Sequence, residues 1–151
     1  MSEDKKVTVN RKARFDYEIL ESFEAGIVLT GTEIKAIREG KVNLSDAYAR
    51  PENGELWLHN AHIAQYSAGT RYNHEPTRSR KLLMHRDQIR ELSRQVSERG
   101  MTLVPLKLYL KQHRAKVELG LARGRKHRDK RRAITDRDRE REAQEAIKRS
   151  R

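Results

Sequence analysis

Apolar and polar residues alternate most strictly in two segments, residues 106–111 and 116–121, which flank a turn at residues 112–114. Because successive side chains of a strand point to opposite faces, this pattern predicts a β-hairpin. One face of the hairpin is rich in leucine, and the other is cationic with one aromatic residue, Tyr109. This hairpin is the strongest indication of β-structure in the chain.

Two further strand pairs are predicted by the same pattern. Residues 47–50 and 55–59 are separated by a segment that ends in Asn-Gly, which favours a tight hairpin turn. Alternation over residues 17–23, followed by a short apolar run at residues 26–30, predicts two strands on either side of a bend at residues 23–26.

Helical spacing of apolar residues predicts two helices. The first begins after Thr32, whose hydroxyl can cap it, and ends at Gly40, which can adopt the left-handed conformation. The second covers residues 86–99 and is followed by Gly100. About six short strands with interspersed helices predict a mainly β fold, an OB-like closed antiparallel β-barrel with flanking helices.

The positive charge of the chain is unevenly placed. The net charge is +12, from 34 Lys and Arg against 22 Asp and Glu, and residues 123–151 alone hold 13 of the cations and 6 of the anions. A segment so charged and so poor in apolar residues cannot offset its ordering entropy. We therefore expect a barrel domain over residues 1–122, with a short N-terminal extension, and a basic C-terminal tail over residues 123–151 that is disordered alone.

This charge surplus indicates polyanionic partners, because each neutralised phosphate releases a condensed counterion. A basic surface that only aids solubility is the alternative, but it does not explain the uneven placement. Three basic segments carry the prediction: residues 10–17, 77–83 and 124–132. The first two have structural alternatives, a core-facing Phe15 and Tyr17 in one case and a simple loop in the other.

Several classes of protein are disfavoured by what the sequence lacks. It contains no cysteine, which excludes disulfides, thiolate zinc sites and cysteine nucleophiles. No apolar run approaches the roughly 20 residues of a membrane span, and no signal peptide is evident, so we expect a soluble cytoplasmic protein without a membrane partner. No phosphate-binding glycine loop or common hydrolase motif occurs. His59 and His62 fall on opposite faces of a predicted strand, which disfavours a shared metal. We expect no catalytic residue, metal or cofactor.

Five ordered segments together resemble one protein family, the SmpB or SsrA-binding proteins of bacterial trans-translation. They are Asn-Arg-Lys-Ala-Arg-Phe-Asp-Tyr (10–17), Phe-Glu-Ala-Gly-Ile-Val-Leu-Thr-Gly-Thr-Glu-Ile-Lys (23–35), Asn-Leu-Ser-Asp-Ala-Tyr (43–48), Pro-Thr-Arg-Ser-Arg-Lys-Leu-Leu (76–83) and Gly-Leu-Ala-Arg-Gly-Arg-Lys-His-Arg-Asp-Lys-Arg (120–131). Five segments in the right order are far more specific than one short motif.

The resemblance implies a function as well as the OB-type barrel. It implies a factor that binds the tRNA-like domain of tmRNA and delivers it to stalled ribosomes. The alanyl-tmRNA would be carried by elongation factor Tu, an indirect partner. The C-terminal tail would fold as a helix in the empty mRNA channel, next to the decoding centre of the small subunit. Such a factor needs no catalytic residue of its own, and we expect it to be a monomer.

The resemblance also implies roles for particular residues. The family's tmRNA contacts fall on Asn10, Arg11, Tyr17, Glu24, Leu83, Lys116, Gly120 and Gly124. Glu24 is an acid on an RNA-binding surface, where a carboxylate can accept hydrogen bonds from base amino groups and so contribute specificity.

The ribosome contacts implied by the resemblance lie in the tail. They fall on Lys126, His127, Arg128, Asp129, Lys130 and Arg131. The family often has a ring before the Asp-Lys-Arg triplet, but here that position is Arg128, with His127 one place earlier. A guanidinium can also stack on bases, so either residue is a candidate for stacking in the decoding centre.

Two rival functions remain open at this stage. The first is a structural ribosomal protein or a general basic OB-fold RNA-binding protein, for which stoichiometric presence on ribosomes that are not stalled would be evidence. The second is an RNA-processing enzyme on an OB scaffold, which the absence of a clustered ligand set argues against.

Overall fold

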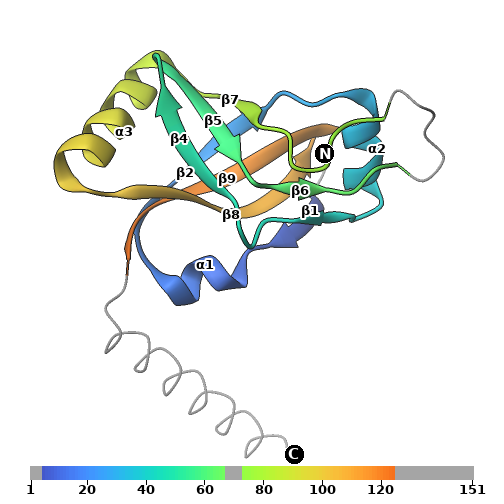
Figure 1. Cartoon of the computed structure of the whole chain (residues 1–151), viewed down its shortest axis with the longest axis horizontal. Helices are drawn as coiled ribbons and strands as arrows, with labels where there is room; N and C mark the ends of the chain where they lie inside the picture. Colours follow the sequence, from blue (N-terminus) through green and yellow to red (C-terminus); the bar gives the residue numbers. More distant parts are fainter. Residues whose placement is uncertain (1–4, 67–72, 125–151) are drawn as a thin grey trace, which may run out of the picture.

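The computed structural model describes residues 5–66 and 73–124. These residues are mainly β, with helices flanking the strands (Figure 1). The strands are β1 (Lys5–Val9), β2 (Tyr17–Ile27), β3 (Val42–Asn43), β4 (Tyr48–Glu52), β5 (Glu55–His59), β6 (His62–Ile63), β7 (Arg80–Leu83), β8 (Thr102–Lys111) and β9 (Arg114–Gly124). The helices are α1 (Arg11–Asp16), α2 (Gly31–Arg38) and α3 (Arg86–Arg99).

Seven of the strands belong to one antiparallel sheet with the order β1-β8-β4-β5-β7-β2-β9, and β9 pairs again with β8. The pairings therefore lead from β8 through β4, β5, β7, β2 and β9 back to β8. Two links in this ring are short. Strand β4 meets β8 at the single residue pair Ala49 and Leu103, and β7 meets β2 at two pairs, Gly26 with Leu83 and Ile27 with Leu82.

Both hairpins predicted from alternation and turn residues are confirmed. In the first hairpin, β8 and β9 pair from Lys111 opposite Arg114 to Thr102 opposite Ala122. Its turn holds Gln112 and His113 at positive φ. Strands β4 and β5 are joined through Asn53 and Gly54, with φ values of 52° and 80°. Positive φ at both central residues matches the twist of the flanking strands, which is why Asn-Gly is favoured there.

The prediction of a bend at residues 23–26 is wrong. Strand β2 is a single strand of 11 residues, and its partner β9 is equally long. The two pair from Tyr17 opposite Gly124 to Gly26 opposite Lys116, with one register shift near residue 20. Gly26 indicated a turn in the sequence, but its φ is not in the left-handed region and it lies inside the strand.

The helices follow the predicted spacing with one correction. Helix α3 covers the predicted residues, buries Ile89 and Leu92, and ends at Gly100 with a φ of 63°. Helix α2 is capped by Thr30 rather than by Thr32, because Thr30 and Glu33 form a reciprocal capping box. Helix α1, which the pattern of apolar residues did not predict, begins after Asn10.

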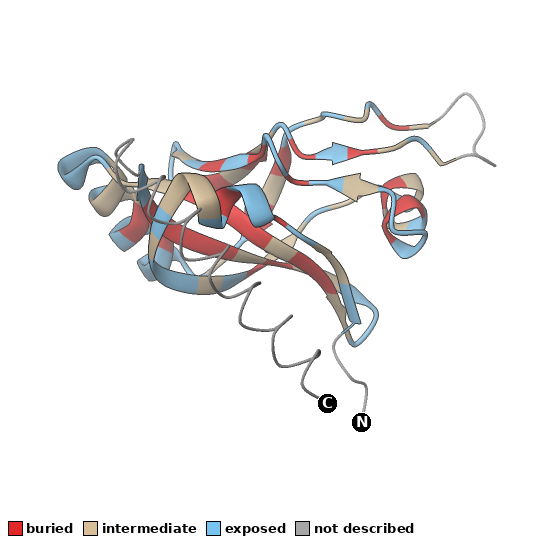
Figure 2. Ribbon diagram, turned by 90° about the horizontal axis from the view of Figure 1, so that it is seen from below, coloured by how far each residue is buried: buried red, intermediate tan, exposed pale blue. Residues whose placement is uncertain are grey.

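The core lies between the strands, and Figure 2 shows buried residues along them and exposed residues on the outer surfaces of the helices. The inward residues of β5 are Leu56 and Leu58, and those of the β8–β9 hairpin include Leu108, Val117 and Leu119, all at most 1% exposed. Burial of such side chains contributes about 1.5–3 kcal/mol each, so the leucine-rich face that the sequence predicts stabilises the fold.

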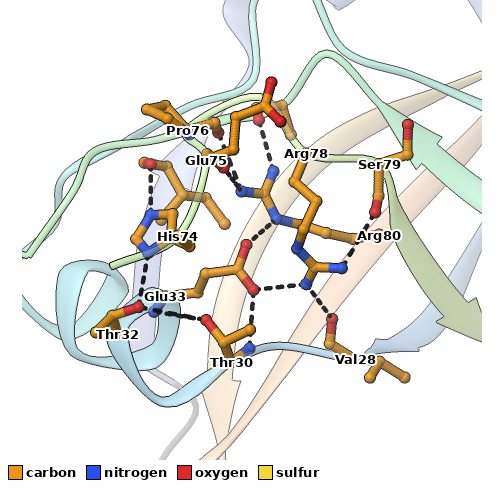
Figure 3. A network of polar contacts seen from close by, with 12 residues as sticks. Val28, Thr30, Thr32, Glu33, His74, Glu75, Pro76, Arg78, Ser79 and Arg80 are labelled. Atoms are coloured by element: carbon orange, nitrogen blue, oxygen red, sulfur yellow. Dashed lines mark hydrogen bonds and ion pairs between the residues drawn. The ribbon is translucent and has the colours of Figure 1, made fainter. Parts of the chain in front are cut away.

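A charged pair lies inside this apolar surrounding. Glu33 on α2 and Arg80 at the start of β7 are both 0% exposed and form an ion pair (Figure 3). Arg80 also donates to the carbonyl oxygens of Ala61, at 2.7 Å, and of Pro76, at 3.0 Å. Glu33 accepts a further hydrogen bond from Arg78 at 2.6 Å. The pair therefore ties α2 to the entry into β7.

A buried histidine extends the same network. His74, which is 6% exposed, contacts the carbonyl oxygen of Ile63 through Nε2 at 2.8 Å and the hydroxyl of Thr32 through Nδ1 at 2.9 Å. Since a carbonyl oxygen only accepts, Nε2 carries a proton, and in the neutral ring Nδ1 then accepts from the Thr32 hydroxyl. The segment before β7 is thus fixed to α2 and β6 (Figure 3).

Replacement of Glu33 tests how much this network contributes to stability. Glu33→Gln leaves the buried Arg80 charge unpaired, so we expect the free energy of unfolding at pH 7 to fall by about 3–5 kcal/mol. The control is Glu18→Gln. Glu18 pairs with Arg123 at 2.8 Å but both side chains are at least half exposed, so its loss costs under about 1 kcal/mol. Urea unfolding followed by circular dichroism measures both.

The difference in free energy of unfolding between wild type and Glu33→Gln should depend on pH in a defined direction. Burial raises the pKa of Glu33, but the hydrogen bonds from Arg78, Thr30 and Arg80 outweigh it, and the net pKa is lowered. A lowered pKa in the folded state means that the stabilisation is present above the unfolded pKa and is lost as the pH falls through the folded value. The difference between wild type and Glu33→Gln should therefore narrow below about pH 4; a gap that stays constant would contradict this account.

Candidate nucleic-acid interface

The residues that were predicted to contact RNA lie on or beside β2 and β9, and all but Gly120 fall into two groups. The first group, the Gly26 end, gathers Glu24, Leu83 and Lys116 around Gly26. The second group, the Tyr17 end, consists of Asn10, Arg11, Tyr17 and Gly124. Tyr17 and Glu24 are seven residues apart on one strand, which at about 3.3 Å per residue separates the groups by roughly 23 Å. The predicted contacts therefore span one long surface.

The Gly26 end is built by three strands that meet side by side. Gly26 on β2 is directly opposite Leu83 on β7 and directly opposite Lys116 on β9. Directly opposed residues point to the same face of a sheet, so Leu83 and Lys116 flank the glycine on the outer face. Leu83 is 52% exposed although it is a large apolar residue. Exposed apolar surface beside a cation suits a contact with an RNA base.

Gly26 makes this arrangement possible because it has no side chain. A Cβ atom at residue 26 would lie 3.3 Å from Cβ and 3.5 Å from Cδ1 of Leu83. The first of these distances is tighter than ordinary van der Waals contact. A larger residue would therefore push the Leu83 side chain away from the position in which it lies across β2.

Glu24 is held in place by a neighbouring tyrosine. The Tyr109 hydroxyl donates to the Glu24 carboxylate at 2.5 Å, and Nζ of Lys111 lies 3.5 Å from the same carboxylate. The Tyr109 hydrogen bond, with the charges of Lys111 and Lys116, holds the pKa of Glu24 below its usual range. The carboxylate is therefore ionised at neutral pH, and Tyr109 and Lys111 hold it in position while 42% of the Glu24 side chain remains exposed.

At the Tyr17 end, Asn10 is a buried anchor. It is 4% exposed, and its Nδ2 donates to the carbonyl oxygens of Leu44 at 3.0 Å and of Pro105 at 2.9 Å. Its Oδ1 caps α1 by accepting from the backbone of Ala13 at 3.2 Å. Both amide protons are thus used within the protein. Asn10 fixes the start of α1, and through it the exposed Arg11.

Tyr17 follows directly after α1 and is half-buried. It packs against the small apolar cluster of Ala13, Val104, Leu106 and Ala122. A surface cavity of about 380 Å³ opens beside Tyr17, between α1 and residues 45–48. The ring is therefore fixed by packing on one side and borders open space on the other.

The two predicted glycines of β9 differ in their surroundings. A Cβ atom on Gly120 would lie 3.1 Å from Cγ2 of Ile19 and 3.1 Å from Cδ1 of Leu106, whereas one on Gly124 would meet nothing within 4 Å. Gly120 is buried beneath these side chains, so its lack of a Cβ atom leaves room for Ile19 of β2 and Leu106 of β8. Gly124 is exposed at the end of the strand.

The basic segment 77–83 contains both buried, structural residues and exposed ones. It is not a simple loop, since residues 80–83 form β7. It is also not uniformly available to RNA, because Arg80 is fully buried and Arg78 bonds to Glu33. Of the cations in this segment only Lys81 lies on the outer face, with its side chain 41% exposed.

Gly26, Tyr109 and Lys111 also belong to the Gly26 end, although they were not among the predicted contact residues. The alternation of residues 106–111 placed Tyr109 and Lys111 on the cationic face, which was a signal for both. Nothing in the sequence showed that β7 pairs with Gly26, because that contact joins residues far apart in the chain.

The predicted ribosome contacts Lys126, His127, Arg128, Asp129, Lys130 and Arg131 lie outside the described residues. Within residues 5–66 and 73–124, no helix is long and apolar enough to cross a membrane. In the same ranges, no three His, Cys, Asp or Glu side chains are placed to hold a metal ion.

Comparison with known proteins gives one consistent result. The family described as SmpB protein matches residues 7–149. The SsrA-binding protein of Shouchella clausii is 57% identical over 147 residues, which are 97% of this chain and 94% of that protein. The SsrA-binding protein of Carboxydothermus hydrogenoformans is 57% identical over 145 residues, 96% of this chain and 97% of that protein.

A solved structure is also similar to this chain. It is described in the words "tmRNA-SmpB: a journey to the center of the bacterial ribosome", and it is 53% identical with a TM-score of 0.67. The likeness covers 80% of this chain and 85% of that one. The similarity thus extends to the three-dimensional arrangement as well as the sequence.

The two glycines of β9 form a matched pair for a stability measurement. In Gly120→Ala the new methyl group would crowd Ile19 and Leu106, so we expect a loss of about 1–3 kcal/mol from overpacking. Gly124→Ala meets open space and no strained φ, so it should be neutral or stabilising by up to about 1 kcal/mol. Thermal and urea unfolding check both. Equal effects of the two substitutions would show that the close approach at Gly120 is not a constraint.

Proposed function

Because the chain belongs to the SmpB protein family, we propose that it is a tmRNA-binding factor that rescues stalled ribosomes by trans-translation. The observation that carries the proposal is the family match over residues 7–149, which includes both the β-rich body and the basic tail. The body has an outer surface that suits RNA, at the Gly26 and Tyr17 ends of β2. The function therefore rests on binding, with no catalytic residue of the chain's own.

The two ends of β2 have different tasks in this proposal. At the Gly26 end, Leu83 packs against a base, Lys116 contacts a phosphate, and the fixed carboxylate of Glu24 accepts hydrogen bonds from base amino groups. At the Tyr17 end, Arg11 and Tyr17 contact the RNA directly. Asn10 and Gly120 act through packing, because both are buried.

The tail has a separate task on the ribosome. Residues 123–151 form a tail domain distinct from the body, although Arg123 and Gly124 still pair with β2. Its residues Lys126, His127, Arg128, Asp129, Lys130 and Arg131 contact ribosomal RNA at the decoding centre, and the rest of the tail senses the empty mRNA channel. Elongation factor Tu takes part through the alanyl-tmRNA, so this work takes place in the cytoplasm.

The fold proposed for the body is an OB-like closed β-barrel. The ring of pairings from β8 back to β8 supports it, as does the flanking position of the helices (Figure 1). Barrels of this type commonly present a face of strands and adjoining loops to nucleic acids.

The proposal predicts selective binding of tmRNA. In gel-shift titrations at physiological salt, the full chain should bind the tRNA-like domain of tmRNA much more tightly than an ordinary tRNA. Lys116→Ala should weaken binding and reduce the slope of log affinity against log salt by about 1, the loss of one phosphate contact. Lys41→Ala is the control, since Lys41 is exposed and pairs with Glu39 away from β2. Equal affinities for the two RNAs would leave only a general basic RNA-binding protein.

Since the body binds tmRNA and the tail contacts the ribosome in this proposal, removal of the tail should affect only one of the two activities. A chain that ends at residue 124 should keep its affinity for the tRNA-like domain within about twofold, because the proposed contacts lie on the body. It should fail to support tagging of nascent chains on stalled ribosomes in a reconstituted translation system. A collapse of tmRNA affinity in the truncated chain would show that the tail is part of the tmRNA site.

A further inference from the structure

Aromatic and cationic side chains line the outer face of β4, β5 and β7, and the proposed function uses none of them. We call this set the β5 row. It consists of Tyr48, Arg50, Trp57, His59 and Lys81. In Figure 1 these three strands lie next to one another, with α3 beside the turn of the β4–β5 hairpin.

The strand register places these side chains on one face. Trp57 is directly opposite Arg50 on β4 and directly opposite Lys81 on β7. Leu56 and Leu58, its neighbours on β5, point inward and are at most 1% exposed. Trp57 therefore points outward, and a cation from each adjacent strand flanks it.

A second aromatic pair continues the row. Tyr48 is directly opposite His59, and their ring centroids are 5.3 Å apart with planes tilted by 37°. Tyr48 is 37% exposed. His59 is fixed from both sides, since Nε2 lies 3.0 Å from the carboxylate of Glu52 and Nδ1 lies 2.8 Å from the hydroxyl of Ser79. The rings are thus held in position before any ligand arrives.

The charges of the β5 row favour bases over phosphates. Lys81 pairs with Glu55 at 3.2 Å, and Glu52 lies against His59. These carboxylates offset the cations, so the surface attracts a phosphate backbone only weakly. Fixed aromatic rings bind unpaired bases by stacking, which is worth about five- to a hundredfold in affinity for each base.

The row is continuous with the Gly26 end. Lys81 and Leu83 are two residues apart on β7 and therefore share its outer face. Beside them lies a groove of about 550 Å³, whose lining includes Lys81, Leu83 and two arginines of α3, Arg86 and Arg90. A strand of RNA that contacts Leu83 thus has a path across β7 to Trp57.

We propose that an unpaired stretch of tmRNA continues past Leu83 onto the β5 row, where its bases stack on Trp57 and on the Tyr48–His59 pair. The proposal rests on the tmRNA-binding function and extends its surface around the body from β2 and β9 to β5 and β4. The arginines of the groove neutralise the phosphates that join the two parts.

Trp57 itself reports on this contact, because the chain contains one tryptophan. Its fluorescence is measured on the full chain during titration with the tRNA-like domain of tmRNA, corrected for absorption by the RNA, while gel shift gives the affinity in parallel. Stacking predicts that tryptophan emission falls in step with binding. Binding without a change in emission would overturn the proposal and leave the function intact. Absence of binding would overturn both.

Variants separate stacking from indirect effects. Tyr48→Leu and Trp57→Leu keep an apolar side chain but remove a ring, and each should weaken binding of the tRNA-like domain by about tenfold. Tyr66→Leu is the matched control, since Tyr66 lies outside the row with Lys35 over its ring, and it should have no effect. Circular dichroism checks that the variants fold. If Trp57→Leu does not fold, the Tyr48→Leu variant still tests the proposal, because it keeps Trp57 and its fluorescence. Quenching by 16S ribosomal RNA but not by the tRNA-like domain would assign the row to the ribosome and contradict the proposal.

Discussion

The buried ion pair between Glu33 and Arg80 decides where β7 lies, and the rest of the ring depends on that strand. Strand β7 joins β5 to β2, yet it has four residues and meets β2 at two residue pairs. So short a contact cannot define register by hydrogen bonds alone. Arg80 is held at once by Glu33, Ala61 and Pro76, so the start of β7 has one position. A buried pair is costly to desolvate and often adds little net stability; here it gives a unique arrangement.

That arrangement explains how a mostly apolar framework presents an RNA-binding surface. With β7 in place, Leu83 lies across Gly26 next to Lys116, and Lys81 stands between Trp57 and the groove beside α3. The same short strand therefore contributes to the Gly26 end and to the β5 row. Glu24 is fixed by Tyr109 from the opposite side of β2. Preorganised side chains on rigid strands lose little entropy on binding, which favours selectivity for one RNA over general attraction to phosphate.

The sequence predicted the local parts of this structure and failed where distant segments meet. The Asn-Gly sequence predicts the hairpin turn at residues 53–54, and the spacing of apolar residues predicts α3 with Gly100 after it. Both predictions are correct because a tight turn and a helix depend mainly on residues that are close in the sequence. The bend at residues 23–26 was wrong, since pairing with β9 overrides the local preference of Gly26. Within the basic segment 77–83, nothing in the sequence shows that Arg80 is buried against Glu33 while Lys81 and Leu83 are not buried. The candidate residues came from a family resemblance, which could not distinguish the buried Asn10 and Gly120 from the exposed Arg11 and Leu83.

The central claim is that β7, β2 and β9 present one RNA contact at Gly26. The most direct measurement is a titration of the isotope-labelled chain with the tRNA-like domain of tmRNA, followed by the backbone amide signals in NMR spectra. The account predicts that the signals of Gly26, Leu83 and Lys116 shift or broaden together at the same RNA concentration. Unchanged signals at all three residues, with changes confined to other parts of the body or to the tail, would contradict it.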